Sequence, residues 1–215
     1  MKYGGTLFFE EFDVINQPSF VEYLKTGWFI NLSVAVDFTA SNGDLHMIHA
    51  NGEMNDYEAA LFEVGNILEP YAYKKKFAGF GFGGIPQYGK LYHENDQVNH
   101  CFNLNGERDA TIENLTSVLE VYKKAVKGTT PYGPTYFEPI LKMVLKYMRT
   151  NIHHPVYHIL LLLTDGCIHD MRVTIDMIVQ CSHFPLSIII VGIGDADFTA
   201  METLDSDEID LVDGK

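Results

Sequence analysis

The sequence of 215 residues is poor in cysteine, in basic residues and in long apolar runs. Its three cysteines, Cys101, Cys167 and Cys181, are odd in number and scattered, which favours structural free thiols over a disulfide framework. No apolar run reaches the ~18 residues that a membrane-spanning helix needs. The first five residues lack the apolar core of a secretion signal. We therefore expect a protein of a reducing compartment.

Basic side chains are outnumbered, since 15 Lys and Arg stand against 29 Asp and Glu and the formal net charge is −14. This balance argues against nucleic acid as a partner, because a nucleic-acid surface needs clustered Lys and Arg. It also argues against direct, metal-free adhesion to anionic lipid. The only basic run, Lys74-Lys75-Lys76, leads into a predicted strand, and we expect it to be a solvated edge.

Strand-like and helix-like segments alternate along the chain. Strands are predicted at 28–36, 77–82, 157–163 and 186–191, with a short edge strand at 98–104. Helical spacing of apolar residues occurs at 57–68, 112–126, 137–148 and 175–179, with Asn55-Asp56 and Asp170 as capping residues. Three of the strands are continuously apolar, which is typical of strands buried on both faces of a parallel sheet.

The predicted fold is therefore a single α/β domain over residues 1–215, with a doubly wound, mostly parallel, Rossmann-like sheet flanked by helices. In this architecture, binding sites form beyond the carboxyl ends of the strands, at the point where the strand order reverses.

Oxygen-bearing side chains stand at two such strand ends. Asp37, Thr39 and Ser41 follow the first apolar strand on alternate residues, and Asp165 follows the strand at 157–163. Thr135 lies in a loop that leads into a helix. Two carboxylates and three hydroxyls form an oxygen-rich set of the kind that Mg²⁺ prefers. We predict that these five residues form a metal site, with Asp37 at the strand end and outside the packed core.

Other polar groups have ordinary structural explanations, which we favour. His46 with His49, or His153, His154 and His158, would need a cysteine pair or a glutamate to complete a zinc site, so we expect surface or capping histidines. The glycines between 79 and 84 are not followed by Gly-Lys-Ser/Thr, which argues against a nucleotide-binding loop. Asp195 and Asp197 fit a turn that starts a helix better than a pair of acid/base carboxylates.

The Asp-x-Thr-x-Ser, Thr and Thr-Asp-Gly set resembles the metal-ion-dependent adhesion site of von Willebrand factor A domains. The flanking segments are more specific and resemble the A domain of copines, from about residue 6 to the end of the chain. These segments are 37–44, 80–83, 132–135, 163–166 and 187–198. Thr39, where most A domains carry Ser, fits the copine pattern.

The resemblance implies a cytoplasmic protein that binds phospholipid in a calcium-dependent way and takes part in membrane trafficking. In copines, two lipid-binding modules precede the A domain and carry it to membranes, where the A domain recruits protein partners. This chain contains neither module, so membrane phospholipid would be reached only through modules outside it. We expect a domain excised from a longer protein, without the family's last strand and helix and with a short loop after Asp44.

The resemblance also implies how the metal is held. The Thr39 and Ser41 hydroxyls would bind Mg²⁺ directly, and Mn²⁺ or Ca²⁺ could use the same site. Thr135 would bind directly or through water, and Asp37 and Asp165 partly through water. In the family's site one metal position stays open, and a carboxylate from a protein partner can fill it.

Two rival functions remain open. A phosphoryl-transfer enzyme on a similar sheet would use Asp37 as nucleophile, but such enzymes commonly carry a second Asp at the position that Thr39 occupies. A copine-like domain of a ubiquitin ligase would stand beside a RING, whose eight Cys and His ligands three scattered cysteines cannot supply. No nucleophile with an activating base is visible, so we expect binding and not catalysis.

Overall fold

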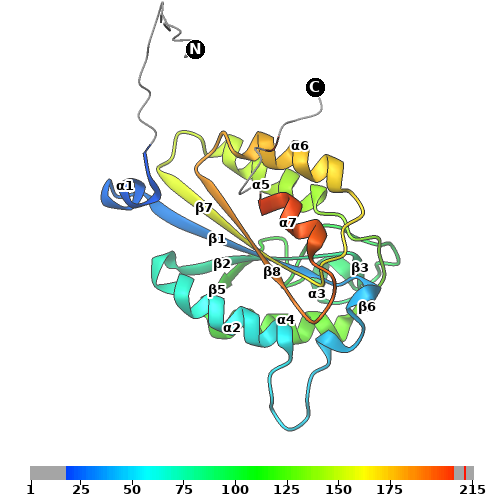
Figure 1. The fold of residues 1–215 in the computed structure, drawn as a ribbon. Coiled ribbons are helices and arrows are strands. Elements are labelled where there is room, and N and C mark those ends of the chain that lie inside the picture. Colours follow the sequence, from blue (N-terminus) through cyan, green and yellow to red (C-terminus); the bar gives the residue numbers. More distant parts are fainter. Residues whose placement is uncertain (1–17, 206–210, 212–215) are drawn as a thin grey trace, which may run out of the picture.

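The computed structural model describes residues 18–205 and 211 and shows a six-stranded, mostly parallel sheet between two layers of helices (Figure 1). Strands β1 (Phe29–Asp37), β2 (Ala72–Phe82), β7 (Val156–Thr164) and β8 (Leu186–Gly192) are parallel. They stand in the order β2-β1-β7-β8. Two short strands, β4 (Phe102–Asn103) and β5 (Thr111–Glu113), pair antiparallel with β2. The predicted fold class is thus confirmed.

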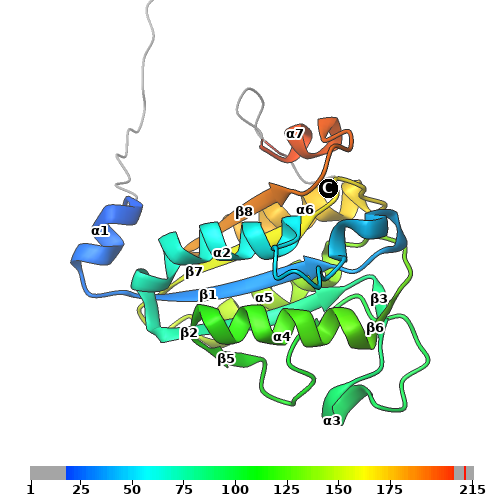
Figure 2. The same ribbon diagram turned by 90° about the horizontal axis from the view of Figure 1, so that it is seen from below.

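Helices cover both faces of this sheet (Figure 2). One face carries α2 (Asp56–Leu68) and α4 (Asn114–Gly128), and the other carries α5 (Glu138–Thr150) and α6 (Met171–Cys181). The smaller elements are α1 (Phe20–Lys25), the 3-10 turns η1 (Ala40–His46) and η2 (Glu69–Tyr71), α3 (Gly89–Tyr92), α7 (Thr199–Asp205), and the two-stranded sheet of β3 (Gly84–Pro86) and β6 (Thr129–Pro131).

Side chains of β1 alternate between two apolar cores. Leu32, Val34 and Val36 are buried against α2 and α4, whereas Ala35 is buried against α5. This alternation follows from the pleat of a strand, in which successive side chains point to opposite faces. Because both faces are covered, most positions are apolar, which explains the long apolar runs of the central strands.

The predicted elements agree with the observed ones with two corrections. The strands at 28–36, 77–82, 157–163 and 186–191 correspond to β1, β2, β7 and β8, and the helices at 57–68, 137–148 and 175–179 to α2, α5 and α6. Ile112 does not open a helix as predicted, because it lies in β5 opposite Phe77 and the helix begins at Asn114. The edge strand predicted at 98–104 contains only Phe102 and Asn103 in strand conformation.

Asp170 occupies the predicted position before α6, where its carboxylate accepts from the Thr174 hydroxyl at 3.2 Å, but it also bonds α5. Its Oδ1 and Oδ2 accept hydrogen bonds from the backbone N–H groups of Phe137 (3.1 Å) and Glu138 (2.9 Å), at the start of α5. The side chain makes no capping bond to the backbone of α6. Free N–H groups at a helix start favour a carboxylate, so Asp170 ties the loop before α6 to the first turn of α5.

The basic run is more than a solvated edge. Lys74 and Lys75 are exposed, as expected, but they lie within β2, next to the central strand β1. The register of β1 against β2 shifts from Ile30↔Ala72 to Leu32↔Phe77. One residue of β1, Asn31, therefore stands opposite four of β2, residues 73–76, and the extra residues form a bulge.

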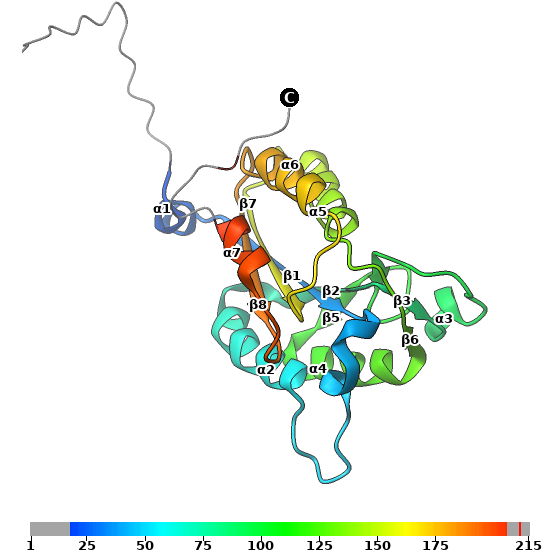
Figure 3. The same cartoon turned by 45° about the vertical axis from the view of Figure 1, so that its right-hand side comes forward.

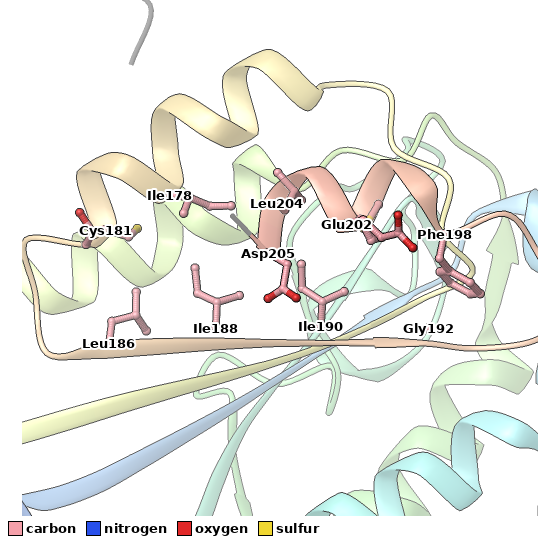
Figure 4. Close-up of a pocket in the computed structure, with 12 residues that line it drawn as sticks. Ile178, Cys181, Leu186, Ile188, Ile190, Gly192, Phe198, Glu202, Leu204 and Asp205 are labelled. Carbon is pink, nitrogen blue, oxygen red and sulfur yellow. The ribbon is translucent and has the colours of Figure 1, made fainter. Parts of the chain in front are cut away.

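The sheet ends at β8 on one side, with α7 beside it (Figure 3). A groove of about 620 Å³ lies between β8, α6 and α7, and Ile178, Ile188, Ile190 and Leu204 point into it (Figure 4).

No helix in the described residues is long and apolar enough to cross a membrane. The missing last strand and helix of the family stay a prediction.

His158 is a buried histidine, which corrects its predicted surface or capping role. It is 2% exposed, and the Asn31 side-chain amide donates to its Nδ1 at 3.2 Å. Because Nδ1 accepts, the proton of the neutral ring lies on Nε2, which has no hydrogen-bond partner in the described part of the chain. Burial lowers the pKa of His158 from 6.5 to about 4. The folded protein therefore holds this ring neutral.

We expect His158 to make the fold sensitive to acid. Its unfolded pKa is higher than its folded pKa, so stability is full above pH 6.5 and falls as the pH drops from 6.5 towards 4. Replacing His158 by Phe should remove roughly 2 kcal/mol of the stability loss between pH 7 and pH 5. Urea titrations of both proteins at the two pH values measure this difference. The exposed His153→Phe is the control, and equal pH dependence in wild type and His158→Phe would contradict the prediction.

Candidate metal centre

The predicted metal residues lie at the carboxyl ends of the two central strands. Asp37 is the last residue of β1, and Asp165 directly follows Thr164, the last residue of β7. These strands are parallel neighbours, with Val36 opposite Leu163, so their ends meet at one edge of the sheet. The loop with Thr135 reaches the same edge, because Ala40 N–H donates to the carbonyl of Tyr132 at 2.8 Å.

Four of the five predicted residues are joined through one oxygen atom, the hydroxyl Oγ1 of Thr39. This atom donates to Asp37 Oδ1 at 2.7 Å, and it lies 3.0 Å from Ser41 Oγ and 3.2 Å from Thr135 Oγ1. Asp165 is the fifth residue and is also buried, and its negative charge acts on Asp37. The structure therefore brings the three chain segments together as predicted.

We expected Asp37 to lie outside the packed core. This expectation is wrong, because Asp37 is 0% exposed. Its Oδ1 accepts from the backbone N–H of Thr39 at 2.9 Å as well as from the Thr39 hydroxyl. Its Oδ2 accepts from the Thr164 hydroxyl at 2.7 Å. Both oxygens are thus held by protein donors, which fixes the carboxylate and leaves it suited to act on a cation through water.

Sequence reasoning included Thr164 in the Thr-Asp-Gly motif without giving it a role, and it did not identify the residues beneath the site. Asn42 donates to the Thr39 carbonyl at 3.1 Å and to the Thr39 hydroxyl at 3.2 Å. Tyr57 in turn donates its hydroxyl proton to Asn42 Oδ1. His46 Nε2 donates to the Asp37 carbonyl at 2.7 Å, and its Nδ1 lies 2.8 Å from the Tyr122 hydroxyl. Helices α2 and α4, which carry the tyrosines, therefore support the loop from below.

His46 is buried within this support, so its predicted surface or capping role is also wrong. Burial lowers its pKa to about 4 and keeps the ring neutral. His49, His153 and His154 are exposed, as expected. No group of three or more His, Cys, Asp or Glu side chains that could hold a metal occurs in residues 18–205 or at 211. The candidate metal ligands are therefore oxygen atoms. They come from two carboxylate and three hydroxyl side chains.

The electrostatics of the site favour a cation. Burial raises the pKa of Asp37 to about 6, against the lowering effect of the hydrogen bonds from Thr39 and Thr164. The nearby charge of Asp165 raises it further. Two carboxylates that share a buried site repel each other, and a divalent cation between them would relieve both costs.

The hydroxyl oxygens also fit such a cation. Thr39 gives its only hydroxyl proton to Asp37, which leaves two lone pairs on its oxygen. Three hydrogen-bond partners, Ser41, Thr135 and Asn42, lie around these two lone pairs. Ser41 is exposed, and a surface groove of about 500 Å³ is lined by Ser41, Asp165 and Asp195, among other residues. The site is therefore closed towards the core and open towards solvent.

The Asp-x-Thr turn alone is not diagnostic of a metal site, because it occurs three times. Thr111 bonds Asp109 Oδ1 through its N–H (2.9 Å) and hydroxyl (2.7 Å), as Thr39 bonds Asp37. Thr199 bonds Asp197 in the same way before α7, which confirms the predicted turn there. Only the turn at Asp37 also meets Ser41, Thr135 and Asp165. The convergence of segments distinguishes the candidate site.

Comparisons with known proteins place this geometry in context. A family model described as Copine matches residues 44–215. The chain is 38% identical over 211 residues to Protein BONZAI 2 of Arabidopsis thaliana, which covers 94% of this chain and 35% of that protein. It is 39% identical over 215 residues to Nicotinic receptor-associated protein 1 of Caenorhabditis elegans, and this match covers 96% of this chain and 33% of that protein. The chain thus spans about a third of the length of these relatives.

Among solved structures, the chain resembles manganese-loaded TRAP protein of Plasmodium vivax, with a TM-score of 0.56 and 15% identity. The match covers 87% of this chain and 66% of the TRAP chain. At this identity the likeness shows a shared fold, which is of the von Willebrand factor A type.

Proposed function

The chain belongs to the copine family, and from this premise we propose that it is a metal-dependent protein-interaction module. We propose that Asp37, Thr39, Ser41, Thr135 and Asp165 hold Mg²⁺, and that Mn²⁺ or Ca²⁺ can bind there too. The observation that carries the proposal is the meeting of Asp37, Ser41 and Thr135 at one hydroxyl oxygen, Thr39 Oγ1.

Each residue has a role that its surroundings support. Ser41 offers a hydroxyl on the solvent side, Thr39 offers a buried hydroxyl beside it, and Thr135 adds a third from the loop before α5. Asp37 and Asp165 supply two negative charges, with Asp37 held in place by Thr39 and Thr164. A bound Mg²⁺ would supply an open coordination position, which an acidic side chain of a protein partner can fill.

Binding is a better account of this site than phosphoryl transfer. A nucleophilic carboxylate needs an oxygen that can approach the phosphorus atom, but both oxygens of Asp37 accept hydrogen bonds and the residue is fully buried. The family and fold are those of an interaction module. Whether a RING accompanies the domain in a longer protein is a question outside this chain.

The role of the longer protein is a further part of the proposal. The curated relatives are about three times as long as the matched region. We propose that lipid-binding modules outside this chain carry a cytoplasmic protein to membranes in response to calcium, and that this domain recruits protein partners there. One relative is named for association with a nicotinic receptor, which fits a protein as the partner.

Metal-dependent capture tests the proposal. The chain is immobilised and exposed to cytosol in Mg²⁺, Mn²⁺, Ca²⁺ or excess chelator, and captured proteins are compared by mass spectrometry. We expect partners that appear with Mg²⁺ and are lost with chelator or on adding free acetate, because acetate competes for the open metal position. An Asp165→Asn chain should lose the same partners. A set of partners that is unchanged in chelator would refute metal-dependent recognition.

A further inference from the structure

A strained bulge of strand β2 lies at the end of the sheet opposite the metal centre. Lys74 and Lys75 have φ angles of 54° and 56°, in the left-handed region that residues with a Cβ rarely adopt. Two consecutive residues of this kind carry a cost that the surrounding structure must offset, and such strain is most often found where function requires it. The bulge holds both lysine side chains in solvent.

Two exposed aromatic rings lie beside the bulge, and one of them contacts Lys74. The rings of Phe29 and Tyr73 lie 4.5 Å apart and are 48% and 46% exposed, and Lys74 Nζ lies 5.1 Å from the centre of the Tyr73 ring. Both rings line a pocket of about 260 Å³ together with Tyr147. The pocket lies where β1 and β7 start. Figure 2 shows the starts of these strands at the α1 end of the sheet.

Amide groups give the pocket a polar side. Asn31 and Asn151 also line it, and Asn31 is held in place by the buried ring of His158. Asn151 is fixed by a bond from its Nδ2 to the Tyr147 carbonyl at 2.9 Å. An apolar side chain in the pocket would therefore pack against the paired rings of Phe29 and Tyr73, while its backbone meets the amide groups.

The bulge lysines carry uncompensated charge in an otherwise acidic protein. Lys76 pairs with Glu113 at 2.6 Å, but Lys74 and Lys75 form no ion pair in the described part of the chain. We propose that this surface, defined by Phe29, Tyr73, Lys74, Lys75 and Tyr147, binds an acidic peptide segment of a partner protein. A bulky apolar residue would fill the pocket and neighbouring carboxylates would pair with the two lysines.

An acidic peptide fits this surface better than an anionic membrane does. Each lysine near a membrane contributes about 1 kcal/mol of attraction, and a flat membrane would also face the negative charge of the domain as a whole, which is −14. A short peptide covers a smaller area than a membrane and so brings fewer of the domain's acidic groups within the screening length of about 8 Å. The pocket also requires a protruding side chain, which a peptide supplies.

The test uses the full chain in excess chelator, so that the metal centre cannot capture carboxylates. The probe is a fluorescent pentapeptide in which four Asp and Glu residues flank one Phe, and binding is followed by anisotropy. We expect saturable binding with a Kd below about 1 mM, which weakens with added salt. Replacing the Phe of the probe by Ala, or Tyr73 of the chain by Ala, should weaken binding at least fivefold.

Charge and backbone strain are separated by two variants. Lys74→Glu/Lys75→Glu should lower affinity at least tenfold, whereas Lys124→Glu/Lys127→Glu, on exposed positions of α4, makes the same change in net charge and should leave affinity unchanged. Lys74→Gly/Lys75→Gly should lose binding without lowering the thermal midpoint, because glycine tolerates positive φ.

Three outcomes would overturn the proposal. They are no saturable binding up to 1 mM probe, equal losses in the bulge and α4 variants, or lysine-dependent binding of phosphatidylserine vesicles in place of the peptide. The last would make the surface a membrane contact. None of these results bears on metal binding, so the metal-dependent function is tested separately.

Discussion

Replacing Asp37 by Asn is expected to lower the affinity of the chain for Mg²⁺ or Mn²⁺ by about 100-fold or more, with the fold intact. Residues that act on a metal through bound water typically change affinity by 10- to 100-fold, and this change also removes a full negative charge from a buried site. Asn keeps the shape of Asp37, and its amide can still pair with the Thr39 N–H and the Thr164 hydroxyl. Isothermal titration calorimetry with either metal measures the loss.

Asn is a cleaner substitution than Ala at this position. Asp37→Ala would leave the Thr39 N–H and the Thr164 hydroxyl unpaired in a fully buried place, at a cost of about 1–3 kcal/mol per group. A loss of metal binding could then reflect a disturbed loop.

The matched control is Asp109→Asn, because Asp109 forms the same turn with Thr111 at an exposed place. Asp165→Asn should act in the direction of Asp37→Asn. Undiminished metal affinity in Asp37→Asn, or an equal loss in Asp109→Asn, would rule out the site.

The fold and the meeting of the two aspartates at one edge of the sheet could be predicted because they depend on local patterns. Continuous apolar runs require a sheet that is covered on both faces, and parallel strands place their carboxyl ends at one edge. Asp37 and Asp165 each stand at such an end, so their proximity follows from topology alone. Thr39 and Ser41 follow from the alternation of side chains after Asp37.

The residues that support the site could not be predicted, because they depend on lateral register and on the path of a loop. Thr164 reaches Asp37 Oδ2 only because β1 and β7 pair with Val36 opposite Leu163. His46 is buried because η1 turns back under the end of β1, where its ring stacks on Tyr57 at 4.1 Å. No periodic pattern in the sequence indicates the contact of Thr164 with Asp37 or the burial of His46.

The bulge at Lys74 and Lys75 shows the same limit. A run of three lysines predicts solvent exposure, and both bulge residues are exposed. The register shift that places them in the left-handed region arises from the pairing of β2 with β1, which is a tertiary property. The sequence therefore indicates the charge of the surface but not its backbone.

Thr135 should matter more for partner capture than for metal binding. Its hydroxyl donates to Thr39 Oγ1 at 3.2 Å, whereas its backbone is held by His169, whose N–H donates to the Thr135 carbonyl at 3.0 Å. Asp170, the next residue, binds the first turn of α5. Removing the hydroxyl thus leaves the loop anchored, and Thr135→Ala changes the contact with the metal without unfolding the loop.

We expect Thr135→Ala to reduce Mg²⁺ affinity less than tenfold and capture of a partner more than tenfold. Thr39, Ser41 and the two aspartates would still hold the ion, but the loop would lose the hydroxyl through which it reaches the ion. A change from water-mediated to direct coordination by Thr135 would shift its loop. Because Asp170 bonds the first turn of α5, the shift would also move α5 and the loop before α6. A partner carboxylate could select one of these two states.

Calorimetry with Mg²⁺ and surface plasmon resonance with a partner identified by capture measure the two affinities on the same protein. Thr135→Ser is the control, because it restores a hydroxyl at the same place and should recover both. Equal capture by Thr135→Ala, or by wild type in excess chelator, would mean that no carboxylate–metal bridge forms. Recognition would then lie on another face of the domain, and the surface around Lys74 and Lys75 would be the first to examine.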